Sequence, residues 1–423
     1  MRFFTSFLTS SFMPKLFFAL LVLLALARTA SAQIDTTRGR YYRPLFPNVT
    51  VASGVNYGSA TTSAGTVQQL LMDVYQPTGD TMQRRPLIIF AHQGGFVSGS
   101  RTEAYMAAIC TRFARLGYVT ASIDYRLIDP STILNNFDTV AIAKGALRGG
   151  QDMKAAVRFF RRDAATVRTY KVHPQYIVVG GASAGAFMAL QTAYLDKLSE
   201  IPAYVGAAAL GGVEGTGGSP GYSSRPLAAL NLSGATESPA LIEPNDPTLC
   251  SLHGTADATV PYAKGRIGSN LPPKYVYGSA LLHPRATQLG IRNVLKTFVN
   301  VGHIPQYGTS ANAAAYSDTT FRVVRDFLRP ALARPGTVLA TSAVRTRPAL
   351  AQAYPVPAEE AVHLVVPEAW ANRLEAQLLD QAGRVVRLVR PSSATLDVPR
   401  GSLKAGIYLL QFPGQVPVRI EFK

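Results

Sequence analysis

The sequence is poor in cysteine, tryptophan and negative charge. Its 423 residues include two cysteines, one tryptophan and 25 acidic residues against 42 basic ones. Two cysteines cannot build a zinc cluster, and neither an H-E-x-x-H nor a C-x-x-C motif is present, so we expect no metal. Cys110 and Cys250 both lie in apolar stretches. A disulfide between them and a pair of buried free thiols therefore both stay open.

The excess of positive charge, +17 in total, is scattered along the chain without a long basic run. This pattern predicts an ordinary basic exported protein and no nucleic-acid partner. Motifs for dinucleotide and phosphate loops are also missing, because the sequence contains neither G-x-G-x-x-G nor G-K-[ST].

The first 32 residues have the pattern of a secretory signal peptide. Arg2 and Lys15 precede an apolar run at 16–27, and the small residues "ASA" follow at 30–32. The run is shorter than the roughly 20 residues of a membrane span, and no later segment is long and apolar enough to form one. We therefore expect cleavage before Gln33, export through the periplasm, and a secreted or cell-surface location.

Strand and helix patterns alternate from about residue 40 to 330. Strands are predicted at 86–92, 119–125, 176–180, 204–212, 248–254 and 294–302, and helices at 102–117, 151–167, 184–195 and 318–328. Such alternation predicts an α/β fold with a mostly parallel central sheet and helices on both faces. Ligands bind such sheets at the carboxyl ends of the strands. The segments 126–150 and 212–246 are expected to form the rim of the pocket.

The composition changes after this body. Residues 331–351 are rich in Ala, Pro, Thr and Arg without a clear period, which predicts a linker. Short strand patterns with turn residues follow over 352–423 and predict a small all-β module.

The segment "GGASAGAF" at 180–187 carries the most informative chemistry. It contains G-x-S-x-G with Ser183 at its centre, after a predicted strand and before a predicted helix. A serine on a sharp strand-to-helix turn needs small neighbours, and the turn lifts its hydroxyl above the sheet. We predict that Ser183 is a nucleophile; the alternative is a glycine-rich turn with an unreactive serine.

A nucleophilic serine needs a base and an orienting acid, in the chain order serine, acid, histidine. His303 follows a predicted strand and is the predicted base. Asp257, in "LHGTADATVP", is the predicted acid, with Glu243 and Asp246 as alternatives. The remaining histidines after Ser183 are less well placed by order or by element: His253, His283 and His363.

The oxyanion of the reaction intermediate needs hydrogen-bond donors. We assign these to the amides of Ala184, Gly94 and Gly95, the last two in "HQGGF" at 92–96. His92 is expected to brace this loop. Asp124 is expected to pair with Arg126 as a structural partner.

Residues 33–330 resemble the α/β-hydrolase fold, and specifically secreted bacterial carboxylesterase-like proteins. The motifs that carry the resemblance are "HQGGF", "SIDYR", "GASAGA", "HGTAD" and "VGH", in this order. Relatives often have His-Gly-Gly-Gly where this chain has His92-Gln93-Gly94-Gly95, so Gln93 departs from the pattern. "MDVYQP" at 72–77 resembles the paired strand that opens such domains.

The segment 352–423 resembles the C-terminal sorting domain of the Bacteroidetes type IX secretion system. The usual Tyr-Pro-Asn-Pro start of that domain stands here as Tyr354-Pro355-Val356-Pro357. The resemblance implies that the secretion machinery is a partner and that the tail is removed after export. The alternative is a generic β-sandwich that binds something.

The resemblance and the site residues together predict a serine hydrolase that cleaves small or polymer-linked carboxylic esters through an acyl-enzyme, without a metal or cofactor. A peptidase of the same fold and an inert surface-binding protein are the alternatives. Short acyl esters, glycan-linked esters and polyesters all stay open as substrates.

Overall fold

The fold is described from a computed structural model of the chain. The structure describes residues 34–129, 139–268, 275–307, 311–333, 352–354, 358–366, 375–380, 384–393, 395–412 and 418–423. The predicted signal peptide, most of the predicted linker and residues 355–357 lie outside these ranges. The chain divides into two compact units, Met1–Thr337 and Val338–Lys423.

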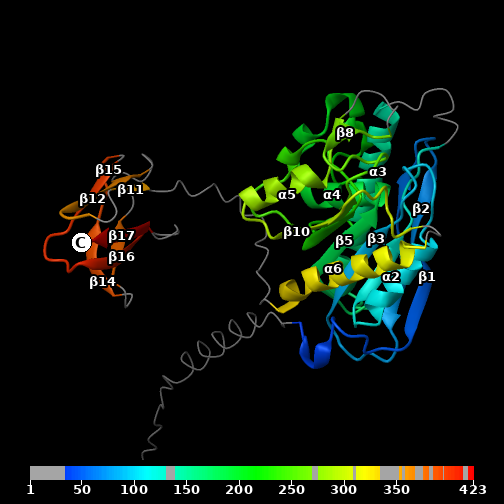
Figure 1. The fold of residues 1–423 in the computed structure, drawn as a ribbon, viewed down its shortest axis with the longest axis horizontal. Helices are drawn as coiled ribbons and strands as arrows, with labels where there is room; N and C mark the ends of the chain where they lie inside the picture. Colours follow the sequence, from blue (N-terminus) through cyan, green and yellow to red (C-terminus); the bar gives the residue numbers. More distant parts are fainter. Residues whose placement is uncertain are drawn as a thin grey trace, which may run out of the picture. The chain divides into compact units, whose positions relative to one another are not determined.

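An eight-stranded sheet forms the centre of the first unit, in the order β1-β2-β4-β3-β5-β6-β7-β10 (Figure 1). Its strands are β1 (Val49–Thr61), β2 (Val67–Pro77), β3 (Arg85–Ala91), β4 (Val119–Ile123), β5 (Val172–Ala182), β6 (Ala228–Leu232), β7 (Thr248–Gly254) and β10 (Asn293–Phe298). β2 pairs antiparallel with β1 and with β4, whereas the other neighbours pair in parallel. The predicted mostly parallel sheet is confirmed.

Helices cover both faces of this sheet, as Figure 1 shows. They are α2 (Ala104–Ala114), α3 (Thr139–Ala165), α4 (Ala184–Tyr194), α5 (Ser279–Gln288) and α6 (Ala313–Ala333). Alternation along β3 explains the two layers. Leu87 and Ile89 pack in one apolar cluster with α3 and α4, while Ile88 and Phe90 pack in another with α2 and α6.

Short elements complete the described part of this unit. They are β8 (Lys264–Arg266), β9 (Tyr275–Tyr277) and the 3-10 helices η1 (Thr37–Gly39), η3 (Leu198–Glu200), η4 (Ala203–Val205), η5 (Ala207–Leu210) and η6 (Pro239–Leu241). In the part of the chain that the structure describes, every helix is too short or too polar to cross a membrane.

The predicted strand at 204–212 is wrong, because this segment forms the 3-10 helices η4 and η5. Gly206, Gly211 and Gly212 there have φ values of 64°, 90° and 67°, which lie outside the extended region of regular strands. The strand at this place in the sheet is β6, inside the segment predicted as a loop. The predicted helix at 151–167 is also longer than expected, since α3 begins at Thr139.

The predicted pairing of Asp124 with Arg126 is also wrong. The Asp124 carboxylate accepts hydrogen bonds from the Arg101 backbone amide (2.7 Å) and guanidinium (2.5 Å). Arg126 instead pairs with Asp152 of α3, at 2.7 Å.

Cys110 and Cys250 are free and buried, and burial raises the pKa of each thiol to about 12. The disulfide alternative therefore falls away.

The described residues of the second unit form two antiparallel sheets, β11-β12-β15 and β14-β13-β16-β17. The strands are β11 (Gln352–Tyr354), β12 (Ala361–Val365), β13 (Ala376–Leu379), β14 (Val385–Val389), β15 (Thr395–Pro399), β16 (Gly406–Gln411) and β17 (Val418–Phe422). Alternating side chains of both sheets, among them Leu364, Leu378 and Leu410, share one apolar core. The predicted small all-β module is confirmed.

Candidate active site

Ser183 stands on the turn between β5 and α4, in a backbone conformation that non-glycine residues rarely adopt. Its φ and ψ angles are 53° and −117°. Its amide donates to the carbonyl of Leu232 in β6, and its own carbonyl accepts from the amides of Ala186 and Phe187. These bonds hold the strained turn, and the first turn of α4 begins directly behind the serine.

The small residues around Ser183 are required by close backbone contacts. A Cβ atom on Gly185 would lie 2.1 Å from the carbonyl oxygen of Ala91, and one on Gly181 would lie 2.4 Å from the carbonyl carbon of Gly185. The turn therefore presses against the end of β3, which pairs with β5 at Ala91 and Gly181. Only glycine permits so short a distance between these two backbone segments.

A second close contact joins the loops that leave β7 and β10. A Cβ atom on Gly254 would lie 2.1 Å from the carbonyl oxygen of Val301. The amide of Thr255 donates to the carbonyl of Phe298, and the amide of Ala256 donates to that of Val301. The two loops therefore run side by side at the carboxyl end of the sheet.

These contacts bring Ser183, His303 and Asp257 into one hydrogen-bonded chain. The Nε2 atom of His303 lies 2.8 Å from the Oγ atom of Ser183, and its Nδ1 atom lies 2.7 Å from Oδ2 of Asp257. The Asp257 carboxylate is fully buried, and the His303 side chain is 16% exposed. A serine, an imidazole and a carboxylate in this order can transfer a proton from the hydroxyl to the imidazole.

The carboxylate of Asp257 is held as an anion. Burial acts to raise its pKa, but hydrogen bonds from His253 and His303, the charge interaction with His303 and a bond from the Val260 amide outweigh burial. The pKa of Asp257 therefore lies well below its ordinary value. An ionised carboxylate is the form that orients an imidazole and stabilises its protonated state.

The alternative acids and histidines lie in other surroundings. Glu243 forms an ion pair with Lys197, and Asp246 forms one with Arg225. Burial raises the pKa of Asp246 to about 6. His283 bonds to Asn293, and His363 bonds to Asp397 in the second unit.

The loop after β3 carries Gly94 and Gly95, whose φ values are 119° and 61°. Among the described residues, no backbone or side-chain acceptor takes a hydrogen bond from the amides of Gly94, Gly95 or Ala184. The start of α4 lies against this loop, because a Cβ atom on Gly185 would also lie 2.8 Å from the carbonyl oxygen of His92. The three amides thus lie just after β3 and β5, two strands that pair side by side up to Ala91 and Gly181.

Gln93 stands where relatives often have glycine. Its side-chain amide donates a hydrogen bond to the carboxylate of Glu103 at 3.2 Å. His92 braces the loop as predicted. Its Nδ1 atom lies 2.6 Å from the Gln93 carbonyl oxygen, and its ring stacks on Tyr125 with the ring centres 4.3 Å apart. Burial lowers the pKa of His92, which favours its neutral form.

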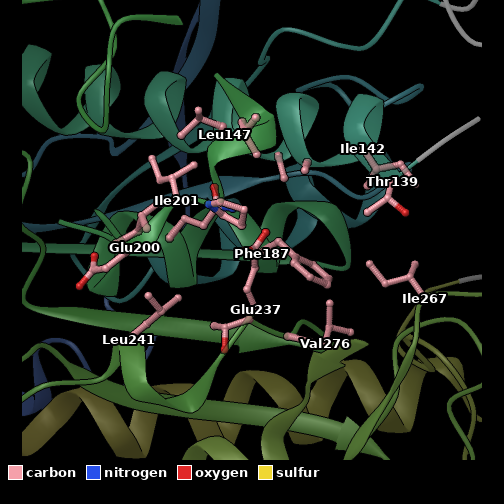
Figure 2. Close-up of a pocket in the computed structure, with 18 of the residues that line it drawn as sticks. Thr139, Ile142, Leu147, Phe187, Glu200, Ile201, Glu237, Leu241, Ile267 and Val276 are labelled. Atoms are coloured by element: carbon pink, nitrogen blue, oxygen red, sulfur yellow. The ribbon is translucent and has the colours of Figure 1, made fainter. Parts of the chain in front are cut away.

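An apolar cavity that opens to solvent lies beside α3 and α4. Figure 2 shows Ile142 and Leu147 of α3 on one side, Leu241 and Val276 on the opposite side, and Phe187 between them. Phe187 lies one helical turn after Ser183. The cavity is lined from both segments expected at the rim, 126–150 and 212–246, and also from α4 and the β8–β9 hairpin.

Two features of the site were not found from the sequence. Phe96 and Phe187 line the cavity with ring centres 6.4 Å apart, and nothing in their sequence separates them from core residues. His253 lies within 3.3 Å of Asp257, although chain order removed it from the site. Its spacing of four residues from Asp257 was the one available signal. No cluster of three or more metal-binding side chains occurs among the described residues.

Comparison with known proteins gives one family and several structures. The family model BD-FAE matches residues 72–209, which include Gly94, Gly95, Ser183 and Ala184 but not Asp257 or His303. The match shows an esterase-like α/β-hydrolase domain, and the predicted fold class is confirmed. A comparison with curated proteins gives no match.

Among solved structures, the chain is similar to esterase 2 of Thermogutta terrifontis. The form phosphoramylated by tabun is 22% identical with a TM-score of 0.46, over 68% of this chain and 96% of that one. The apo form is 23% identical with a TM-score of 0.46, over 68% and 96%. The propionate-bound form is 22% identical with a TM-score of 0.45, over 67% and 95%.

Proposed function

We propose that this protein, with its esterase-like hydrolase domain, cleaves carboxylic esters through a covalent acyl-serine. The observation that carries the proposal is the hydrogen-bonded chain from Ser183 through His303 to Asp257. Ser183 Oγ attacks the ester carbonyl carbon while His303 Nε2 takes its proton. His303 then gives this proton to the leaving alcohol, and the acyl group stays on Ser183.

The second half of the reaction uses the same groups. His303 takes a proton from water, the hydroxide attacks the acyl carbon, and the proton returns to Ser183 as the acid leaves. The amides of Ala184, Gly94 and Gly95 hold the oxyanion in both halves. Asp257 orients His303 and stays ionised throughout. No step needs a metal or cofactor.

A series of p-nitrophenyl esters from acetate to palmitate tests this proposal. We expect kcat/KM to rise about fourfold for each added methylene while the acyl chain stays inside the apolar cavity, because each buried methylene contributes about 0.8 kcal/mol. Ala143→Phe narrows the cavity and should lower turnover of the longer esters while leaving acetate unchanged. Folded wild-type protein without turnover of any ester would refute the proposed ester hydrolysis.

We further propose that the enzyme is exported through the periplasm and that residues 352–423 address it to a type IX secretion system. The supporting features are the signal-peptide pattern of residues 1–32 and the β-rich tail. In a host with this system, we expect full-length protein at the cell surface or in the medium. Deletion of 352–423 should retain it in the periplasm; equal release of both forms would contradict the proposed role of the tail.

A further inference from the structure

A line of buried polar side chains leads from β6 to the carboxylate of Asp257. Asn231, Ser279 and His253 are all fully buried, on β6, α5 and β7 respectively. We infer that His253 is a positioning residue, which holds the Asp257 carboxylate in the orientation that His303 requires. We further infer that Asn231 and Ser279 fix the proton of His253 on Nε2. The catalytic part of this inference rests on the proposed function.

The direction of the hydrogen bonds can be followed from Asn231. Its Oδ1 atom accepts from the amide of Gly234 at 2.8 Å, so its Nδ2 atom points to the Oγ atom of Ser279, 3.2 Å away. The Ser279 hydroxyl accepts this bond. Its own hydrogen is then free to bond Nδ1 of His253 at 2.9 Å. In this arrangement Nδ1 is the acceptor and carries no proton.

The opposite edge of the His253 ring leads to the same conclusion. Its Nε2 atom lies 3.0 Å from the carbonyl oxygen of Val260 and 3.3 Å from Oδ2 of Asp257. A carbonyl and a carboxylate can only accept, so Nε2 must carry the proton and share it between them. Both edges of the ring thus select one neutral tautomer.

This proton completes the set of donors around Asp257. Oδ1 accepts from the amides of Thr259 and Val260, at 2.9 and 2.8 Å. Oδ2 faces the two imidazoles of His253 and His303, which are the ionisable side chains that bond Asp257 among the described residues. Without His253, the buried Oδ2 atom would keep one donor, and the pKa of Asp257 would rise. The carboxylate would then hold His303 less rigidly.

Kinetics of His253→Leu, with His253→Gln beside it, test the positioning role. His253 lies behind Asp257 and lines no part of the cavity, so we expect kcat to fall about 10- to 100-fold at unchanged KM. A more basic Asp257 favours the protonated form of His303, so the acid side of the pH profile of kcat/KM should move up by about 0.5 pH unit. The Gln side chain keeps an N–H donor, so His253→Gln should restore most of kcat and most of the wild-type pH profile.

His283→Leu is the matched control, because His283 is also a buried histidine with one side-chain partner, Asn293. We expect it to lose thermal stability as His253→Leu does, but its pH profile should match that of the wild type. An unmoved pH profile in His253→Leu, or the same change in both variants, would overturn the positioning role. If His253→Leu does not fold, Ser279→Ala should give the same changes at smaller size.

NMR of ¹⁵N-histidine-labelled protein tests the inference without activity. We expect the ring proton of His253 on Nε2, and a changed His303 Nδ1–H signal in His253→Leu. A His253 signal of the Nδ1–H tautomer would overturn the inference. Hydrolysis that is equal in wild type and Ser183→Ala would instead refute the proposed function, and the NMR result would still decide the role of His253.

Discussion

Ser183→Ala is expected to lower kcat/KM for a p-nitrophenyl ester by about 10⁴-fold or more, because the covalent route disappears with the hydroxyl. The free energy of unfolding should change by about 1 kcal/mol or less, since the variant loses one hydrogen bond, to His303, and keeps the same turn. Steady-state rates and thermal unfolding of both proteins measure the two quantities.

A serine-reactive phosphonate provides an independent measurement on the same pair of proteins. Wild type should take up one label per chain, and peptide mass analysis should place it on Ser183. The variant should take up none. A folded variant that keeps wild-type turnover, or a label on another serine, would show that Ser183 is not the nucleophile.

Gly185→Ala is expected to lower the free energy of unfolding by about 4 kcal/mol or more. Only severe packing defects cause a loss of this size. The added Cβ atom would lie 2.1 Å from the carbonyl oxygen of Ala91 and 2.6 Å from its carbonyl carbon. Both are backbone atoms of the last residue of β3, so no side-chain rotation can relieve the contact. Denaturant unfolding measures the change.

Gly302→Ala is the matched control for this substitution. Gly302 also lies beside the active site, next to His303, but no atom comes within 4 Å of the Cβ atom it would gain. We expect wild-type stability from this variant. If Gly185→Ala were equally stable and still took up the serine label, the turn would not depend on the contact between α4 and β3.

Several parts of the fold and site could be predicted because they depend on neighbours in the chain. The run at 86–92, the strand at 248–254 and the helix at 184–195 all lie where the apolar pattern placed them, within a few residues. The turn around Ser183 is also local, since its glycines and alanines stand within two residues of the serine. The segment 204–212 was wrongly predicted as a strand because it is apolar, whereas its glycines adopt left-handed backbone angles.

The strand β6 was not predicted, because its sequence lacks the usual signals of a strand. "AALNL" is five residues long, rich in alanine and without alternation, because parallel strands in the centre of a sheet are buried on both faces. Asp124 was paired with the arginine nearest in sequence, whereas in the structure it bonds Arg101, which lies 23 residues before it. Sequence distance is a poor guide when a crossover helix separates the partners.

The fold class, the serine turn and the candidate acid and histidine could be predicted without the structure, because each depends on residue size and polarity within a short segment. Three features required the folded structure: which acid faces His303, that His253 also contacts this acid, and that α3 and α4 line an apolar cavity. These contacts join loops from different strands. Their partners are fixed by the strand order and by close backbone contacts such as Gly254 with Val301, which no local pattern encodes.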